Sequence, residues 1–219
     1  MKPVISSDAV LNGLIDFSKP YVRVSLRVPF TVKEGVVVDV ETTGLPMEVY
    51  DRELGRMVLK RNKVHMVSLG FLERNLLYVY GLWNPQKWRV FERVCRNLLK
   101  GKKPLYAYSC SFEECFLGFK GNWIECLEYG IGYSDWNDEY YQYRKSLRRA
   151  AYDYGLKDSF YDVDGRDVPK LWKRFVNHGN FKCLWKIIYH NMADVFRLGW
   201  IVWRKENRDG RLNDNRVEA

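Results

Sequence analysis

The fold is decided by one stretch, Gly35-Val36-Val37-Val38-Asp39-Val40-Glu41-Thr42-Thr43-Gly44-Leu45. A run dominated by β-branched valines and closed by Thr-Thr-Gly is typical of a buried strand followed by a turn. Because side chains alternate across a strand, Val37, Asp39 and Glu41 share one face. Two carboxylates therefore leave the end of a buried strand on the same side.

Two neighbouring buried carboxylates are costly, because each loses its hydration and each repels the other. A cation between them offsets both costs, and hard oxygen ligands favour Mg²⁺ or Mn²⁺ over zinc. The alternative is that Asp39 and Glu41 are simply solvated at the mouth of the strand. The valine run before them and the turn after them favour a metal site.

Composition places the chain among globular proteins. Of its 219 residues, 47% are hydrophobic and 16% aromatic, enough for a substantial core in one domain. The net charge of +9 favours a polyanionic partner. No apolar run is long enough for a transmembrane helix, and the first residues lack a secretory signal, so we expect a cytoplasmic protein with no membrane contact. Its five cysteines lack zinc-site spacing and are expected to be free thiols, although a disulfide stays possible in a hot-living source.

Strand and helix patterns alternate after the opening strand, which predicts an α/β domain. We expect further strands at 21–28, 63–71, 76–80 and 105–109, and helices at 88–99, 112–119, 146–154, 168–177 and 182–204. Residues 48–62 are expected to be turn-like, and residues 130–143 to be a surface loop or an insertion. The predicted plan is an extension at 1–34, which adds to a sheet edge or mediates self-association, a domain at 35–204 and a polar, fraying tail at 205–219.

Three more residues are candidates for the same site. His190 and Asp194 are four apart and share one face of the last predicted helix. Glu113 lies at the head of the helix after strand 105–109, where ligands gather in α/β sheets. An acid is favourable in the first turn of any helix, so position alone leaves a structural role for Glu113 equally open.

Three segments together resemble the motifs of DEDD-type 3′–5′ exonucleases of the RNase H-like superfamily. Residues 38–45 resemble the first motif, 107–113 the second and 189–195 the third, in the family's order. Residues 147–154 and 164–172 are similar to a subgroup of predicted bacterial and archaeal exonuclease domains. The resemblance implies an RNase H-like fold: a central mixed five-stranded sheet flanked by helices, here with an N-terminal β-rich extension.

The resemblance also implies roles for individual residues. Asp39, Glu41 and Asp194 would hold two divalent metal ions, Mg²⁺ or Mn²⁺, with Glu113 assisting. The turn Thr42, Thr43, Gly44 and Leu45, together with Ser109, would contact the terminal nucleotide. Two positions depart from the family: Glu113 stands where Asp is usual, and Ser109 where Asn is usual. The residue that orients the attacking water is either His190 or Tyr189, and the spacing to Asp194 favours His190.

The sequence thus predicts a metal-dependent 3′–5′ exonuclease acting on single-stranded DNA or RNA, with DNA favoured and DNA repair a suitable process. An RNA-directed or structure-selective nuclease, or a catalytically weak nucleic-acid-binding module, remains an alternative. Aromatic residues could stack bases or belong to the core: Trp83, Trp88, Tyr106 and Tyr108. Basic residues could follow the backbone or simply be solvated: Lys100, Lys102, Lys103, Arg144, Lys145, Arg148 and Arg149.

Overall fold

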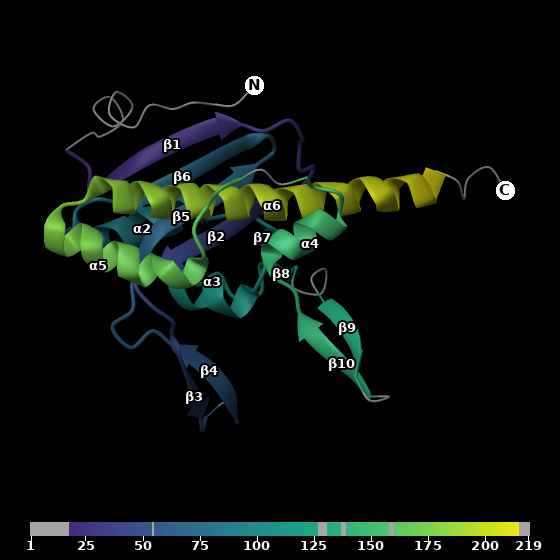
Figure 1. The fold of residues 1–219 in the computed structure, drawn as a ribbon, viewed down its shortest axis with the longest axis horizontal. Helices are drawn as coiled ribbons and strands as arrows, with labels where there is room; N and C mark the ends of the chain where they lie inside the picture. The colour runs from purple at the N-terminus through teal and green to yellow at the C-terminus, as the bar shows by residue number, and fades with distance from the viewer. Residues whose placement is uncertain (1–17, 54, 127–130, 137–138, 158–159, 215–219) are drawn as a thin grey trace.

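The structure is a computed structural model that describes residues 18–53, 55–126, 131–136, 139–157 and 160–214, without the side chains of 131–144 and 208–214. The start of the predicted extension, residues 1–17, and the end of the predicted tail, 215–219, lie outside the described residues (Figure 1). The boundaries of the extension, domain and tail stay a prediction.

One mixed sheet forms the centre of the molecule, with strands in the order β1-β6-β5-β2-β7-β8. Four strands are antiparallel neighbours: β1 (Tyr21–Arg27), β6 (Leu76–Leu82), β5 (Met66–Glu73) and β2 (Val36–Thr42). Two shorter strands, β7 (Leu105–Ala107) and β8 (Trp123–Glu125), continue the sheet in parallel with β2. The sheet has six strands rather than the predicted five, because β1, from the predicted extension, pairs with β6 at its edge. Self-association through this extension stays a prediction.

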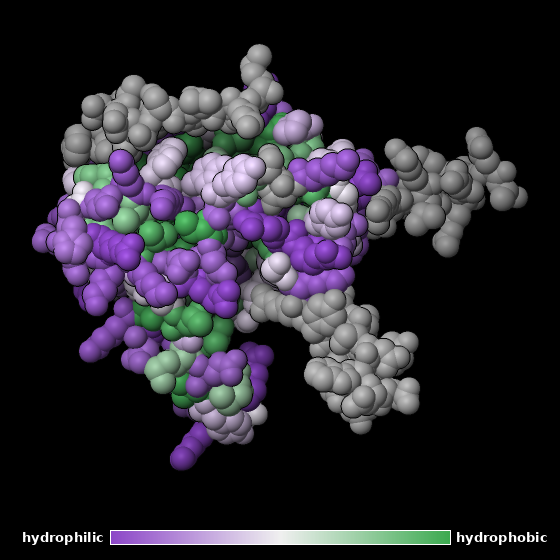
Figure 2. All heavy atoms as spheres, viewed as in Figure 1, coloured by the Kyte–Doolittle hydropathy of each residue, from purple (hydrophilic) through white to green (hydrophobic). Residues whose placement is uncertain are grey.

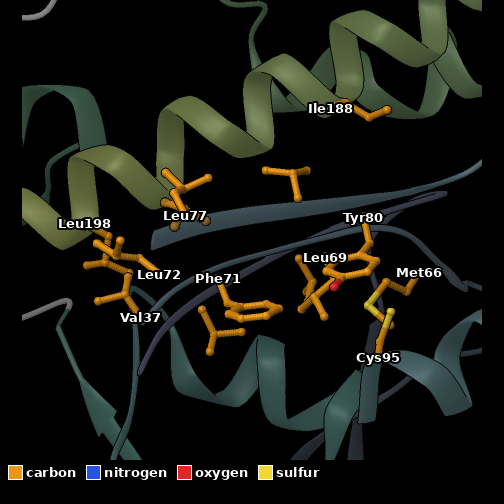
Figure 3. Packing of buried hydrophobic residues seen from close by; sticks show 14 of the residues in the cluster. Val37, Met66, Leu69, Phe71, Leu72, Leu77, Tyr80, Cys95, Ile188 and Leu198 are labelled. Carbon is orange, nitrogen blue, oxygen red and sulfur yellow. The ribbon is translucent and has the colours of Figure 1, made fainter. Parts of the chain in front are cut away.

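Helices cover both faces of the sheet. The long helix α6 (Phe181–Asp214) crosses one face, beside α5 (Val168–His178) and α4 (Leu147–Asp153) (Figure 1). On the other face lie α2 (Trp88–Leu99), which follows the short turn η1 (Pro85–Lys87), and α3 (Cys110–Leu117). Figure 3 shows Val37 and Leu77 on the α6 side and Phe71 and Cys95 on the α2 side. The alternation predicted for β2 therefore divides its side chains between two cores.

Glycines allow α6 to lie unusually close to the sheet. A Cβ placed on Gly70 of β5 would lie 2.6 Å from Cγ2 of Val195, and one on Gly199 of α6 would lie 2.4 Å from Cδ2 of Leu72. At these two points no side chain of the glycine lies between α6 and the sheet, so the neighbouring layer packs directly on the glycine backbone. This close approach brings the polar side chains of α6 within reach of the carboxylates on β2.

Two hairpins replace segments that the sequence predicts to be irregular. Residues 48–62 contain β3 (Met47–Asp51) and β4 (Arg56–Lys60), and residues 130–143 overlap β9 (Ile131–Trp136) and β10 (Glu139–Arg144). Both hairpins extend from the same side of the body (Figure 1). The turn-like assignment of 48–62 was wrong, whereas the hairpin at 131–144 agrees with an insertion rather than a loop. Strands were not predicted in either segment because they pair only with each other, so the apolar alternation of a buried sheet is weak in them. Helix α6 also continues ten residues beyond its predicted end.

Other sequence predictions can be compared directly. All five cysteines are free, as expected. Among the described helices, none combines the length and apolar character needed to cross a membrane.

Candidate active site

The end of β2 opens into a cleft of about 580 Å³. Its walls come from β2 and the turn after it, from α3, from the start of α4, from η3 (Gly165–Asp167) before α5, and from the middle of α6. Of the site residues predicted from the sequence, all but Thr43 line this cleft: Asp39, Glu41, Thr42, Gly44, Leu45, Ser109, Glu113, His190 and Asp194. The fold therefore brings all three motifs together.

Asp39 is fixed to α6 by an amide. The Nδ2 atom of Asn191 donates to the Asp39 carboxylate and, at 3.2 Å, to the Asp39 carbonyl oxygen. Ser68 on β5 in turn donates to Oδ1 of Asn191 at 3.0 Å. Asn191 and Ser68 are fully buried, so this chain of hydrogen bonds holds the first carboxylate in one orientation.

Glu41, His190 and Asp194 form the tightest group in the cleft. Nε2 of His190 lies 3.4 Å from Oε1 of Glu41 and 3.6 Å from Oδ2 of Asp194. One potential ligand atom from each residue lies within 4.8 Å of the others. The four-residue spacing on α6 places His190 and Asp194 on one face, as the sequence indicates. Tyr189, the alternative, instead packs against Phe160, with ring centroids 6.1 Å apart.

Two residues that the sequence did not reveal complete the surroundings of His190. The Asp162 carboxylate lies 2.8 Å from Nδ1 of His190, which donates a hydrogen bond to it. It also forms a bidentate ion pair with the Arg197 guanidinium, with both contacts at 2.7 Å. Arg197 also donates to Oδ1 of Asp194 at 2.6 Å. The side chains of Asp162 and Arg197 are 0% and 2% exposed. The available signal was Arg197 itself, a lone cation three residues after Asp194 in an otherwise apolar stretch of helix.

The turn after β2 has two differently placed threonines. The Thr42 hydroxyl donates to the Gly44 carbonyl oxygen at 2.5 Å, which closes the turn at the edge of the cleft. Thr43 points away: its backbone N–H donates to the carbonyl oxygen of His65 (3.0 Å), and its hydroxyl accepts from the His65 N–H (3.2 Å). Leu45, 80% exposed, stands at the rim. The structure thus places Thr43 outside the cleft and the other three turn residues within it.

The second motif forms the opposite wall. Ser109 is the N-cap residue of α3, and Glu113 lies buried in the first turn of that helix. Tyr108 and Phe112 give this wall an aromatic surface, and the Tyr108 hydroxyl donates to the carbonyl oxygen of Lys145 at 2.7 Å. Of the predicted stacking residues, Tyr108 alone lines the cleft, whereas Trp88 stacks on His65 at a centroid distance of 5.1 Å.

Comparison with known families gives one match. A family model described as the RNase H superfamily matches residues 36–203, which is most of the chain. The chain belongs to this superfamily. Searches of curated proteins and of solved structures found no match. Membership agrees with the expected α/β fold and indicates nuclease-type activity on nucleic acid, since RNase H-like proteins are typically nucleases that use divalent metals.

Two carboxylates of this RNase H-like cleft, those of Asp39 and Glu41, are poorly neutralised by the protein. Burial, and then the charge of Asp194, raises the pKa of Asp39 well above its ordinary value. Burial, followed by the charge of Asp39, does the same to Glu41, and burial also raises the pKa of Asp194. Among the described residues, no lysine or arginine lies within ion-pair distance of Asp39 or Glu41. Such a set of oxygen donors, with one imidazole, fits a hard divalent cation.

The surroundings of His190 fix the orientation of its ring in the cleft. Burial alone would raise the pKa of Asp162, but hydrogen bonds from Arg197 and His190 and the charges of Arg197 and Arg148 hold that pKa well below its usual range. Asp162 is therefore ionised and can only accept, so Nδ1 of His190 carries the proton. Nε2 is directed at Glu41 and Asp194, 3.4 and 3.6 Å away.

Proposed function

We propose that the protein is a metal-dependent 3′–5′ exonuclease that removes nucleoside monophosphates from single-stranded nucleic acid, with DNA favoured over RNA. The observation that carries the proposal is the convergence of Glu41, His190 and Asp194, with Asp39 beside them, in one cleft at the end of β2. Superfamily membership supports nuclease chemistry, and the three motifs support the exonuclease assignment.

Asp39, Glu41 and Asp194 would hold two divalent ions, Mg²⁺ or Mn²⁺, with Glu113 close enough in the same cleft to assist. Bound there, such ions supply charge stabilisation for the attacking and leaving oxygens of an in-line displacement. The fit rests on the donor set, because Asp39 and Glu41, two buried acids with raised pKa values, have no lysine or arginine within ion-pair distance among the described residues. Asn191 keeps the Asp39 carboxylate turned toward this position.

His190 would act as the general base. Its Nε2 atom faces the cleft and would take a proton from the attacking water, while Asp162 holds the ring through Nδ1. The water oxygen bonds to phosphorus, the bond from phosphorus to the 3′ oxygen of the preceding nucleotide breaks, and the proton finally passes to that oxygen. The released product is a nucleoside 5′-monophosphate. Asp162 is thus a positioning residue, and Arg197 fixes Asp162 in turn.

The walls of the cleft suit an unpaired terminal nucleotide. Tyr108 and Phe112 offer aromatic surface on one side, and Leu45 projects from the turn on another. Base stacking on aromatic side chains is tolerant of sequence and needs a base freed from its complement. A volume of about 580 Å³ lies in the range of sites for small ligands, which fits the end of a strand rather than a duplex.

A cleavage assay tests the proposal. Single-stranded DNA and RNA of about 20 nucleotides, labelled at the 5′ end, are incubated with Mg²⁺, Mn²⁺ or chelator. We expect a ladder that shortens from the 3′ end only with metal, and no cleavage of circular single-stranded DNA. Glu41→Gln should reduce the rate more than about 100-fold. Glu48→Gln, an exposed acid on β3 outside the cleft, is the matched control and should leave the rate unchanged.

The same assay separates the alternatives. Cleavage of circular DNA would contradict the exonuclease assignment and favour an endonuclease. A preference for RNA or for a folded substrate would favour an RNA-directed or structure-selective nuclease with the same site. Binding without cleavage under either metal would refute the enzyme assignment and favour a nucleic-acid-binding module. That alternative is motivated by Glu113 and Ser109, which depart from the usual Asp and Asn of the family.

A further inference from the structure

A second hollow adjoins the cleft on the exposed side of α5. This α5 groove has a volume of about 460 Å³ and lies between the turn after β2 and the helix, with Thr43, Lys170, Lys173 and Val176 among its lining residues. Pro169 lines both the cleft and the α5 groove. Thr43 lies in sequence between Thr42 and Gly44, which line the cleft. The two hollows are therefore neighbours, with Pro169 and the turn between them.

The lining of the α5 groove combines positive charge with apolar surface. Lys170 and Lys173 are exposed and lie three residues apart on the helix, which places their side chains next to each other. Pro169, Trp172 and Val176 supply the apolar part. Figure 2 shows hydrophilic surface over α5, bordered by hydrophobic surface toward the β3–β4 hairpin. Lysines beside an apolar strip match a single strand, whose phosphates need cations and whose bases and sugars need apolar contact.

Basic residues on another side of the cleft are already engaged in ion pairs. Lys145 and Arg149 both pair with Asp153, at 2.7 and 3.2 Å, and Arg148 pairs with the buried Asp162. By contrast, the ion pair of Lys170 with Asp167 is long, 3.6 Å, and both of its side chains are exposed. The sequence pointed to residues 144–149 as a path for the strand, but the side chain of Arg144 lies outside the described residues and the next basic side chains are engaged. The lysines of the α5 groove are therefore held less tightly by carboxylates than the basic residues at 145–149.

We propose that the α5 groove binds the part of a single strand that precedes its 3′-terminal nucleotide, with phosphates on Lys170 and Lys173. This inference rests on the proposed function, since the cleft must hold the 3′ end. A site of about 580 Å³ has room for the end of a strand only, so the preceding nucleotides lie on the surface next to it. The α5 groove is the neighbouring hollow that carries exposed lysines.

The test measures binding without cleavage. Oligothymidylates and oligouridylates of about 2, 4, 8 and 12 nucleotides, with a 5′ fluorophore, are titrated with the full chain in chelator, and anisotropy is read from about 50 to 300 mM salt. The variant is Lys170→Gln combined with Lys173→Gln. The control is Arg174→Gln, which removes an exposed charge from the same helix about 100° around from Lys173 and outside the groove.

We expect the double variant to bind the longest strands at least about fivefold more weakly at low salt, with a salt slope reduced by about 1.4, or 0.7 for each lost phosphate contact. Binding of the dinucleotide should not change, and Arg174→Gln should behave as the native chain. An unchanged slope, an equal loss in the control, or an equal loss for the dinucleotide would each overturn the proposal. Because no cleavage is measured, a length-dependent loss supports the groove even if the exonuclease assay fails. Conversely, cleavage from the 3′ end with unaltered binding in the double variant refutes the groove alone.

Discussion

Arg197→Met is the most informative single change, because Arg197 is buried and carries three contacts of 2.6–2.7 Å to two carboxylates. Its loss leaves Asp162, whose side chain is 0% exposed, with only His190 and the half-exposed Arg148. Breaking a buried ion pair from one side costs about 3–5 kcal/mol. Since Arg148 still reaches Asp162, we expect a value near the lower end, about 3 kcal/mol.

A loss of this size is easily measured. It is a large fraction of the roughly 5–15 kcal/mol that stabilises a typical domain, and it lowers the melting temperature by about 10 °C at about 2–4 °C for each kcal/mol. The assay is urea unfolding in chelator, followed by tryptophan fluorescence. Arg174→Met, which removes an exposed arginine from α5, is the control and should change the free energy of unfolding by less than about 0.5 kcal/mol.

The decisive comparison is the double variant Arg197→Met with Asp162→Asn. If the cost of Arg197→Met is an isolated buried carboxylate, removing that charge recovers at least about 1 kcal/mol, and the double variant is more stable than Arg197→Met alone. A double variant less stable than either single variant would refute this reasoning. So would a loss below about 1 kcal/mol for Arg197→Met itself.

Three further predictions follow from the cleft. Burial, and then neighbouring carboxylates, raises the pKa of Glu41 above its ordinary value of 4.5. The contribution of Glu41 to the stability of the metal-free chain is therefore full at low pH. It is lost as the pH rises through the raised pKa. Mg²⁺ should therefore raise the melting temperature more at about pH 8 than at about pH 5, and Glu41→Gln should flatten the difference; equal effects at both pH values would contradict this. A Cβ on Gly165 would lie 3.1 Å from Nε2 of His190, so Gly165→Ala should lower the cleavage rate about 10- to 100-fold with an unchanged melting temperature; an unaffected rate would argue against a role for Nε2. Glu113→Gln should lower the rate about 10- to 100-fold while Glu114→Gln, its neighbour outside the cleft, leaves it unchanged, and equal rates for the two would remove Glu113 from the site.

The elements with strong local patterns were predicted correctly from the sequence. Helix α2 has the predicted bounds, because its apolar residues recur at three-and-four spacing and face the sheet. The valine run marked β2 because a strand covered on both faces must be apolar throughout. Strand β8 was missed, since three residues at the edge of a sheet carry no detectable period. The β3–β4 and β9–β10 hairpins were missed for a related reason: neither is buried against the central sheet.

The candidate site divides in the same way. Asp39 and Glu41 follow from strand alternation, and His190 and Asp194 follow from helix spacing, because both are local regularities of the backbone. Asp162 could not be predicted, since it lies in the segment between α4 and η3 and acquires its role only when that segment folds against α6. Thr43 could not be separated from Thr42 either, because both hydrogen bonds that turn it away from the cleft are made with the backbone of His65, the residue before β5.

The distribution of charge links the stability of this protein to its proposed activity. The carboxylates on the two sides of the cleft have different partners. Asp162 and Asp194 share the buried Arg197, whereas within the described part of the chain Asp39 is held by Asn191 and Glu41 lies beside His190, with no arginine or lysine in ion-pair distance of either. The unbalanced negative charge at Asp39 and Glu41 would repel a phosphate, even though the net charge of +9 attracts a nucleic acid to the protein as a whole. A scissile phosphate can approach these carboxylates only if cations lie between them, so the same deficit that destabilises the metal-free chain makes substrate engagement dependent on the metal.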